Sequence, residues 1–111
     1  DIHIFYHSDG NIEAIIPELI AAGVTILNPI QPECMDPVQI RREYPDLNLH
    51  GTIGTQSTMP WAAPDEVRRV VRQRIETCGA KGRLILAPTH VLEPEVPIEN
   101  IEAFVDAARD G

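Results

Sequence analysis

The chain has 111 residues, of which 43% are hydrophobic and 23% are charged, values ordinary for one soluble globular domain with a modest core. Its net charge of −8 argues against binding to nucleic acids or anionic membranes, because both need clustered cations. No apolar run approaches the roughly 20 residues that span a bilayer, and the first residues lack the zones of a secretory signal. We therefore expect a cytoplasmic protein whose partner is a small molecule, with no nucleic acid and no membrane.

The first residue indicates whether the sequence is part of a longer protein, and the cysteines indicate whether a disulfide is expected. It begins at Asp1 without a Met and almost at once enters a strand-like run, as a piece of a longer protein would. Cys34 and Cys78 are far apart and belong to no framework of further cysteines, so we expect no disulfide. Cys78, near the end of a helical pattern, is expected to pack as a buried apolar residue.

The first part of the chain alternates strand-like and helical patterns. Residues 2–6 and 24–28 are short apolar runs and indicate strands, the second of them buried on both faces. Between them, Asn11 is a candidate N-cap of a helix that Pro17 either kinks or starts and that Gly23 ends.

A proline-rich loop leads into the next strand–helix unit. Residues 28–37 hold three prolines, which remove backbone donors and favour extended geometry. Asp36 then caps a short helix that has Pro37 at its first position and runs to about Tyr44. Residues 47–53 indicate a third strand.

The clearest helix follows a polar loop at residues 54–63. Gly51 and Gly54 indicate close backbone approach where the third strand ends. The helix begins at Pro64, has acids in its first turn and ends before Gly79. Its apolar positions follow a 3.6-residue period: Val67, Val70, Val71, Ile75 and Cys78.

The remaining pattern completes the fold prediction. Residues 83–87 indicate a fourth strand, residues 88–96 a loop, and Pro97 starts a last helix. We expect that helix to bury Ile98, Ile101, Phe104, Val105 and Ala108. Alternating strands and helices imply a parallel sheet, and four strand–helix units are half of an eight-unit (β/α)8 TIM barrel of about 250 residues. We predict one half-barrel domain over residues 1–111, whose open edges pair with a second copy, as a homodimer, or with a missing half.

Reactive side chains follow each predicted strand, where the active sites of parallel strand–helix folds gather. They are His7, Asp9, Gln31, Glu33, Cys34, Thr55, Gln56, Thr89 and His90. Imidazole and carboxylate groups suit a Zn²⁺ ion, so the candidate metal ligands are His7, Asp9, Glu33 and His90, with Cys34 as a substitute. Gln31, Thr55 and Gln56 are candidate substrate-binding residues.

Simpler interpretations stand beside the metal hypothesis. His7 and Asp9 also fit a solvated turn with an Asx hydrogen bond. Glu33 could equally cap the following helix, and His90 could donate to a carbonyl group of its proline-rich loop. Cys34 fits packing as well as ligation. The remaining histidines, His3 and His50, fall within predicted strands, where we favour satisfied interior positions over catalysis.

The placement of charge is a further guide. The nine basic residues all fall in predicted helices or just before a strand: Arg41, Arg42, Arg68, Arg69, Arg72, Arg74, Lys81, Arg83 and Arg109. The loops at the strand ends carry acids: Asp9, Glu33, Asp36, Glu93 and Glu95. This distribution suits a bound cation better than a polyanionic substrate.

Several stretches resemble the uroporphyrinogen decarboxylase superfamily, which includes the decarboxylases and the cobalamin- or coenzyme M-linked methyltransferases. The matching stretches, in order, are residues 7–11 (HSDGN), 26–31 (ILNPIQ), the turn at 51–55 and 86–90 (LAPTH), followed by Pro94, Pro97, Glu99 and Asn100. They cover nearly the whole chain. The family is a (β/α)8 barrel, and the resemblance implies that this chain is its C-terminal half.

The resemblance implies two chemistries. Zinc-dependent methyltransferases of the superfamily carry a His-x-Cys-Gly motif and a later Cys; here His7 matches the His, while Asp9 and His90 stand where the cysteines would be. Harder ligands change the metal preference, so the implied cofactors are zinc or a harder divalent ion, with cobalamin as a partner cofactor. In the decarboxylase branch a late His contacts the substrate, and His90 matches it. That branch's arginine-rich segment has no counterpart in this sequence.

We therefore expect a decarboxylase-like protein that transfers methyl groups at a metal centre. His7, Asp9 and His90 would hold the metal, with Glu33 as fourth ligand or base. The metal would polarise or deprotonate the methyl acceptor. His7, Glu33 and His90 are accordingly the candidate catalytic residues. The alternatives are a lyase that decarboxylates porphyrinogens in porphyrin biosynthesis, and an inactive half-barrel that only dimerises.

Overall fold

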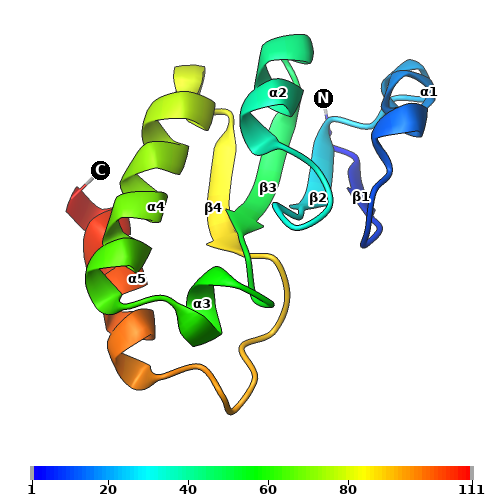
Figure 1. Cartoon of the computed structure of the whole chain (residues 1–111). Helices are drawn as coiled ribbons and strands as arrows, with labels where there is room; N and C mark the ends of the chain where they lie inside the picture. Colours follow the sequence, from blue (N-terminus) through cyan, green and yellow to red (C-terminus); the bar gives the residue numbers. More distant parts are fainter. Residues whose placement is uncertain (1, 111) are drawn as a thin grey trace.

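A computed structural model of the chain describes residues 2–110. Four parallel strands form one sheet in the order β1 (Phe5–His7), β2 (Ile26–Ile30), β3 (Asn48–Ile53) and β4 (Leu84–Pro88) (Figure 1). The helices between and after them are η1 (Glu13–Ile15), α1 (Ile16–Ala21), α2 (Pro37–Glu43), α3 (Thr58–Trp61), α4 (Pro64–Cys78), η2 (Ala80–Gly82) and α5 (Ile98–Asp110). The predicted α/β class is confirmed, because consecutive parallel strands alternating with helices make a partial (β/α)8 barrel.

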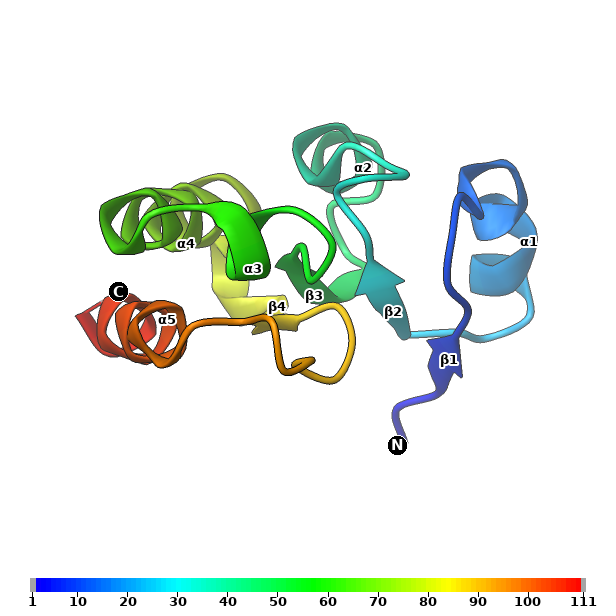
Figure 2. The ribbon, with the colours of Figure 1, turned by 60° about the horizontal axis from the view of Figure 1, so that its bottom comes forward.

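The helices cover one face of the sheet. Figure 2, a view toward the carboxyl ends of the strands, shows α1, α2 and α4 along one side, and α5 beside α4 beyond β4. Within residues 2–110, no helix lies over the opposite face. No helix in this part of the chain is long and apolar enough to cross a membrane.

Two hydrophobic clusters hold the helices on the sheet. One lies under α1 and α2 and contains Ile16, Leu27, Ile30, Met35, Ile40, Leu47, Leu49 and Cys78. The other lies between β3, α4 and α5 and contains Ile53, Met59, Val67, Val70, Val71, Val96, Ala103 and Ala107. Cys78 is fully buried, as predicted, and both cysteines are free thiols.

Several helix ends lie where local sequence signals predicted them. The Asp36 side chain accepts a hydrogen bond of 3.0 Å from the Val38 backbone N–H, so it caps α2 as predicted. Pro17 lies in the first turn of α1 and therefore starts the regular helix, with the 3-10 turn η1 before it. Helix α4 runs over the predicted span and is followed by Gly79.

Other boundaries differ from the prediction. β1 begins at Phe5, and His3 lies before it, exposed. β2 continues through Pro29 to Ile30, across an irregularity in its pairing with β3. The expected loop at 54–63 contains the short helix α3.

The buried side of α5 was predicted wrongly in part. Ile98 is 61% exposed and Val105 is 41% exposed, whereas Asn100, Ala103 and Ala107 are buried. Small alanine side chains let α5 approach its neighbours closely, so the contact face follows the alanines and turns the larger Ile98 and Val105 outward.

Candidate functional site

A hollow lies where the four strands end. It has a volume of about 540 Å³ and is lined by Asp9, Gln31, Thr55, Gln56, Pro60, Trp61, Thr89, His90, Val91, Glu93 and Glu95. Every strand contributes to the lining. Asp9 follows β1 and Gln31 follows β2, while Thr55 and Gln56 follow β3, and Thr89 and His90 follow β4. Of the predicted site residues, the structure brings Asp9, Gln31, Thr55, Gln56 and His90 to this hollow.

Buried polar side chains fix the loops around the hollow. The Gln31 side-chain oxygen accepts a hydrogen bond of 3.1 Å from the Gly10 backbone N–H, which ties the loop after β1 to the end of β2. With that oxygen engaged, the amide NH₂ is the group that Gln31 can offer to a ligand. The hydroxyl groups of Thr55 and Thr89 lie 3.4 Å apart and join the loops after β3 and β4.

Glu33 lies outside the hollow. Its carboxylate accepts a hydrogen bond from the Ser57 hydroxyl and lies directly against Gly54. A Cβ atom at position 54 would clash with the carboxylate of Glu33 where it now lies, so only glycine leaves room for this contact. Glu33 therefore joins the loops after β2 and β3, and its predicted role as a base or ligand stays a prediction.

His7 belongs to a separate arrangement on the uncovered face of the sheet. Its Nδ1 lies 2.6 Å from the Asn28 side-chain oxygen, and the Asn28 side-chain nitrogen lies 2.7 Å from Nδ1 of His50. The other nitrogen of His7, Nε2, lies 3.8 Å from a carboxylate oxygen of Asp9. Burial lowers the pKa of His50 below its usual value, because the charged ring loses solvation.

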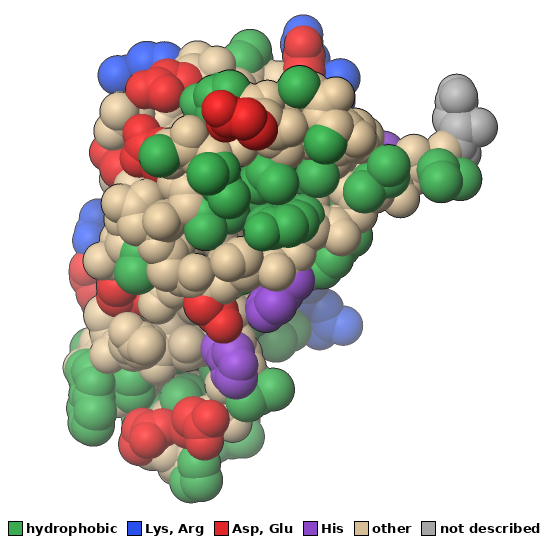
Figure 3. Space-filling model, turned by 90° about the vertical axis from the view of Figure 1, so that its right-hand side faces the viewer, with side chains coloured by type: hydrophobic (Ala, Val, Ile, Leu, Met, Phe, Trp, Pro, Cys, Tyr) green, Lys and Arg blue, Asp and Glu red, His purple; other side chains and the backbone are tan. Residues whose placement is uncertain are grey.

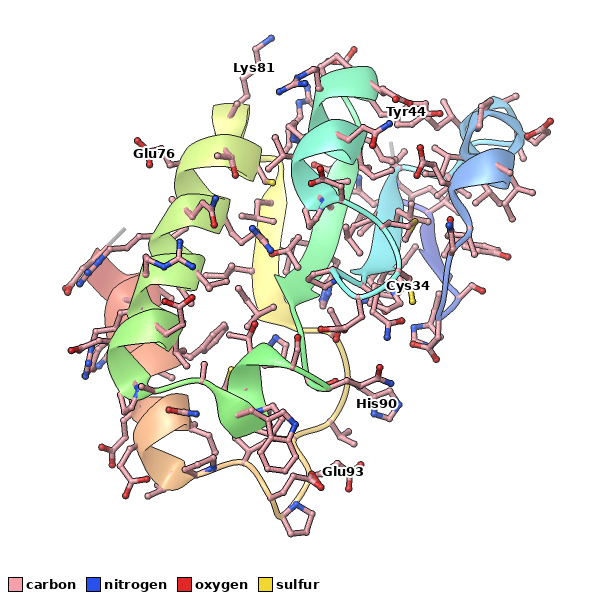
Figure 4. The ribbon with its side chains drawn as sticks, viewed as in Figure 1. Cys34, Tyr44, Glu76, Lys81, His90 and Glu93 are labelled. Atoms are coloured by element: carbon pink, nitrogen blue, oxygen red, sulfur yellow. The ribbon has the colours of Figure 1, made fainter. Side chains whose placement is uncertain are left out.

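His90 and Glu93 lie beyond the strand ends, and Cys34 lies on the loop after β2 (Figure 4). Cys34 is partly buried and packs against the cluster under α1 and α2. Lys81 and Glu76 lie at the opposite end of the molecule. The residues that line the hollow include no Lys or Arg and three acids, so the hollow disfavours anions.

Sequence reasoning missed one wall of the hollow. Trp61 and Pro60, on α3, line it, and Trp61 is 72% exposed. Asn100 holds this helix in place, donating hydrogen bonds to the carbonyl oxygens of Met59 and Ala62. The only tryptophan of the sequence, at the end of a polar loop that follows a predicted strand, was the available signal.

The predicted metal ligands do not gather around one point. Among the side chains of residues 2–110, no three of the types His, Cys, Asp and Glu are placed to hold one metal ion. His7 and Asp9 form a pair, Glu33 is engaged by Ser57, and His90 lies on the loop after β4. Figure 3 shows histidine and acidic side chains near one another on the β1 side of the molecule. The donor set does not fit a single ion in this arrangement.

Parallel strand–helix units with a polar hollow at their carboxyl ends define part of a (β/α)8 barrel. The whole chain, residues 1–111, matches the family described as "Uroporphyrinogen decarboxylase (URO-D)", and the chain belongs to this family. The resemblance stated from the sequence is thereby confirmed.

Two known proteins show the extent of the likeness. A uroporphyrinogen decarboxylase from Drosophila virilis is 32% identical over 77 residues, which are 68% of this chain and 19% of that protein. A solved methyltransferase from Methanosarcina mazei shares the fold with a TM-score of 0.78 at 20% identity, over 97% of this chain and 31% of the other. The chain thus spans less than a third of the length of either protein.

Proposed function

We propose that the chain supplies half of the active site of a uroporphyrinogen decarboxylase-like barrel enzyme, and that its hollow binds a small neutral or cationic substrate for methyl transfer. The observation that carries this proposal is the lining of the hollow. It joins loops from all four strands and combines amides, hydroxyls, an imidazole and three carboxylates, with no Lys or Arg.

The charge of the hollow favours methyl transfer over porphyrinogen decarboxylation. A porphyrinogen bears several carboxylates, and a site for it needs cations to neutralise them. Asp9, Glu93 and Glu95 would instead repel such a substrate. Porphyrinogen decarboxylation remains the alternative, in which residues outside 2–110 supply the cations that neutralise the substrate's carboxylates.

The lining residues differ in the chemical role that each can play. Gln31 and Gln56 can orient a substrate by hydrogen bonds, and Trp61 gives an apolar wall that keeps water from one side. A thiol that accepts a methyl group loses its proton as the new carbon–sulfur bond forms and the donor's bond to the methyl carbon breaks. His90 is the imidazole at the hollow that can take this proton. A divalent metal and cobalamin stay predictions.

The test uses Trp61, the only tryptophan of the chain, as a fluorescent reporter in the hollow. The probes are three thiols of similar size, namely cationic cysteamine, neutral 2-mercaptoethanol and anionic 2-mercaptoethanesulfonate, and uroporphyrinogen. We expect the cationic thiol to change the emission at the lowest concentration and the anionic thiol at the highest. Saturable binding of uroporphyrinogen that is tighter than any thiol would overturn the proposal in favour of decarboxylation.

Two variants serve as a matched pair for this titration. Glu93→Gln removes one carboxylate from the hollow and is expected to weaken the preference for the cationic thiol severalfold. Glu76→Gln removes an acid at the opposite end of the molecule and should leave the preference unchanged (Figure 4). An equal effect of both changes would show that net charge, rather than the hollow, sets the preference.

A second candidate is a half-barrel whose measurable property is self-association. Phe5 is 51% exposed and Ile85 is 44% exposed. Both lie on the sheet face without helices, since Phe5 contacts His50 edge-on and Ile85 pairs with His50 in register. A second copy or an N-terminal half of the barrel would cover this face and the open edges of β1 and β4.

A further inference from the structure

Three side chains from neighbouring strands form a continuous chain on the uncovered face of the sheet. His7 of β1, Asn28 of β2 and His50 of β3 are linked by the two contacts of 2.6 and 2.7 Å. Asn28 is only 8% exposed, so no solvent competes strongly for its amide. Each histidine contacts Asn28 through its Nδ1 atom, so neither Nε2 atom takes part in these two contacts.

The chemistry of one amide constrains both rings. An asparagine side chain presents an oxygen that only accepts and an NH₂ that only donates. The Nδ1 atom that faces the oxygen must therefore carry a proton, and the Nδ1 atom that faces the NH₂ must be bare. Two histidines bridged in this way cannot share the same state at Nδ1, whichever way the amide is turned.

The two contacts give the direction of the amide, with its oxygen toward His7 and its NH₂ group toward His50. Burial disfavours the charged form of His50, and a neutral ring with a bare Nδ1 carries its single proton on Nε2. This fits the Asn28 NH₂ group facing His50, as the contacts show. The Asn28 oxygen then faces His7, whose Nδ1 donates, and Nε2 of His7 is the atom turned toward Asp9.

We propose that Asn28 is a positioning residue that holds His7 and His50 in opposite tautomers, with the proton of His7 on Nδ1 and the proton of His50 on Nε2. Nε2 of His7 then lies 3.8 Å from a carboxylate oxygen of Asp9, next to the hollow that Asp9 lines. His50 presents an N–H donor on the same sheet face, with the edge of Phe5 packed against its ring at a centroid distance of 5.4 Å. This inference concerns the resting protein and does not rest on the methyl-transfer proposal.

The tautomers can be read directly from nitrogen chemical shifts. The unmodified protein, labelled with ¹⁵N in histidine, is measured at about pH 8, above the usual histidine pKa, where neutral rings predominate. We expect His7 to show a protonated Nδ1 and a bare Nε2, the less common form of free histidine, and His50 to show the reverse. Finding both rings in the same tautomer would overturn the proposal without any variant being made.

Variants then assign the cause. Asn28→Asp offers two accepting oxygens, so His50 should change to a protonated Nδ1 while His7 keeps its form. Asn28→Leu should release His7 to the common form with a protonated Nε2. Asn48→Leu removes a nearby strand amide that bonds the Thr25 carbonyl group, and it should leave both rings unchanged. The proposal fails if Asn28→Leu leaves His7 with its proton on Nδ1.

Discussion

Arg41 on α2 donates its Nε–H to the carbonyl oxygen of Cys78, the last residue of α4, over 3.0 Å. The guanidinium group of Arg41 is buried and also donates to the carbonyl oxygens of Tyr44, Pro45, Leu47 and Arg83. One side chain thus joins the end of α4 to the segments that enter β3 and β4. Burial lowers the pKa of Arg41, yet the group stays charged because an arginine pKa lies so far above neutrality.

Replacing Arg41 by Met should destabilise the fold by about 2–4 kcal/mol, because it leaves five carbonyl groups without their charged donor. Arg41→Lys should lose nearly as much, since an ammonium group cannot reach carbonyls on several sides. The measurement is urea unfolding followed by circular dichroism. The matched control is Arg69→Met on the exposed face of α4, where an ion pair with Glu66 is lost with little effect. Equal stability of the two Met variants would contradict this account of Arg41.

Two nearby glycines should respond differently to alanine. Gly51 has φ of +109° in the buried end of β3, a conformation that costs a residue with a side chain about 1–3 kcal/mol. Gly54 has an ordinary φ, and its added Cβ would meet only the ends of the Glu33 and Ser57 side chains, which can swing away. We expect Gly51→Ala to lower the free energy of unfolding by that amount and Gly54→Ala to lower it by less than about 1 kcal/mol.

The Gly54→Ala variant also tests the contact between Glu33 and Ser57. If the added methyl group displaces the Glu33 carboxylate, a further Glu33→Ala change should cost nothing more. The double variant would then unfold at the same urea concentration as Gly54→Ala alone. A clear additive loss would show that Glu33 keeps a stabilising partner after the methyl group is added.

His50 should make stability depend on pH in the acid range. Its pKa in the folded protein is lowered by burial, so the unfolded state binds a proton first as the pH falls. The contribution of His50 is therefore fully present above the unfolded pKa of about 6.5 and is lost as the pH falls through that value toward the lowered folded pKa. Unfolding midpoints measured between about pH 8 and pH 5 should fall more steeply for the natural protein than for His50→Gln. Parallel profiles would show that the ring titrates alike in both states.

The strand–helix units were readable from sequence because their signals are local. The cap of α2 needs only Asp36 and Pro37, and α4 shows its period within one segment. The contacts of Glu33 were not readable, since its partner Ser57 is 24 residues away and nothing local marks the pair. Helix α3 is four residues long, too short to show a period. The convergence of loops on one hollow followed from the parallel topology, but which side chains face it depends on rotamers that no pattern specifies.

Asn100 should control the wall of the hollow that sequence analysis missed. It is 1% exposed, and its side-chain NH₂ donates to the carbonyl oxygens of Met59 and Ala62 in and after α3, at 2.7 and 2.8 Å. Asn100→Ala should free α3 at a cost of about 1–3 kcal/mol in stability. Trp61 on the same helix should become more accessible to a quencher such as acrylamide. As the control, Glu102→Ala changes an exposed residue of α5 and should leave quenching as it is. Unchanged quenching in Asn100→Ala would mean that packing, rather than these hydrogen bonds, holds the helix.

Self-association tests the sheet face that no helix covers. Phe5 and Ile85 lie on that face, where each exposes about half of its surface. Burying the exposed half of such a side chain stabilises an assembly by roughly 1 kcal/mol. We expect sedimentation equilibrium of the 111-residue chain to give the mass of a dimer, and Ile85→Glu to give a monomer because a charge cannot be buried there without a partner. Val105→Glu on α5 is the control, since Val105 is 41% exposed on a helix rather than on this sheet face. If Val105→Glu dissociated the dimer and Ile85→Glu did not, the contact would lie on α5. If the unmodified chain were a monomer, self-association would be excluded as a role of this face.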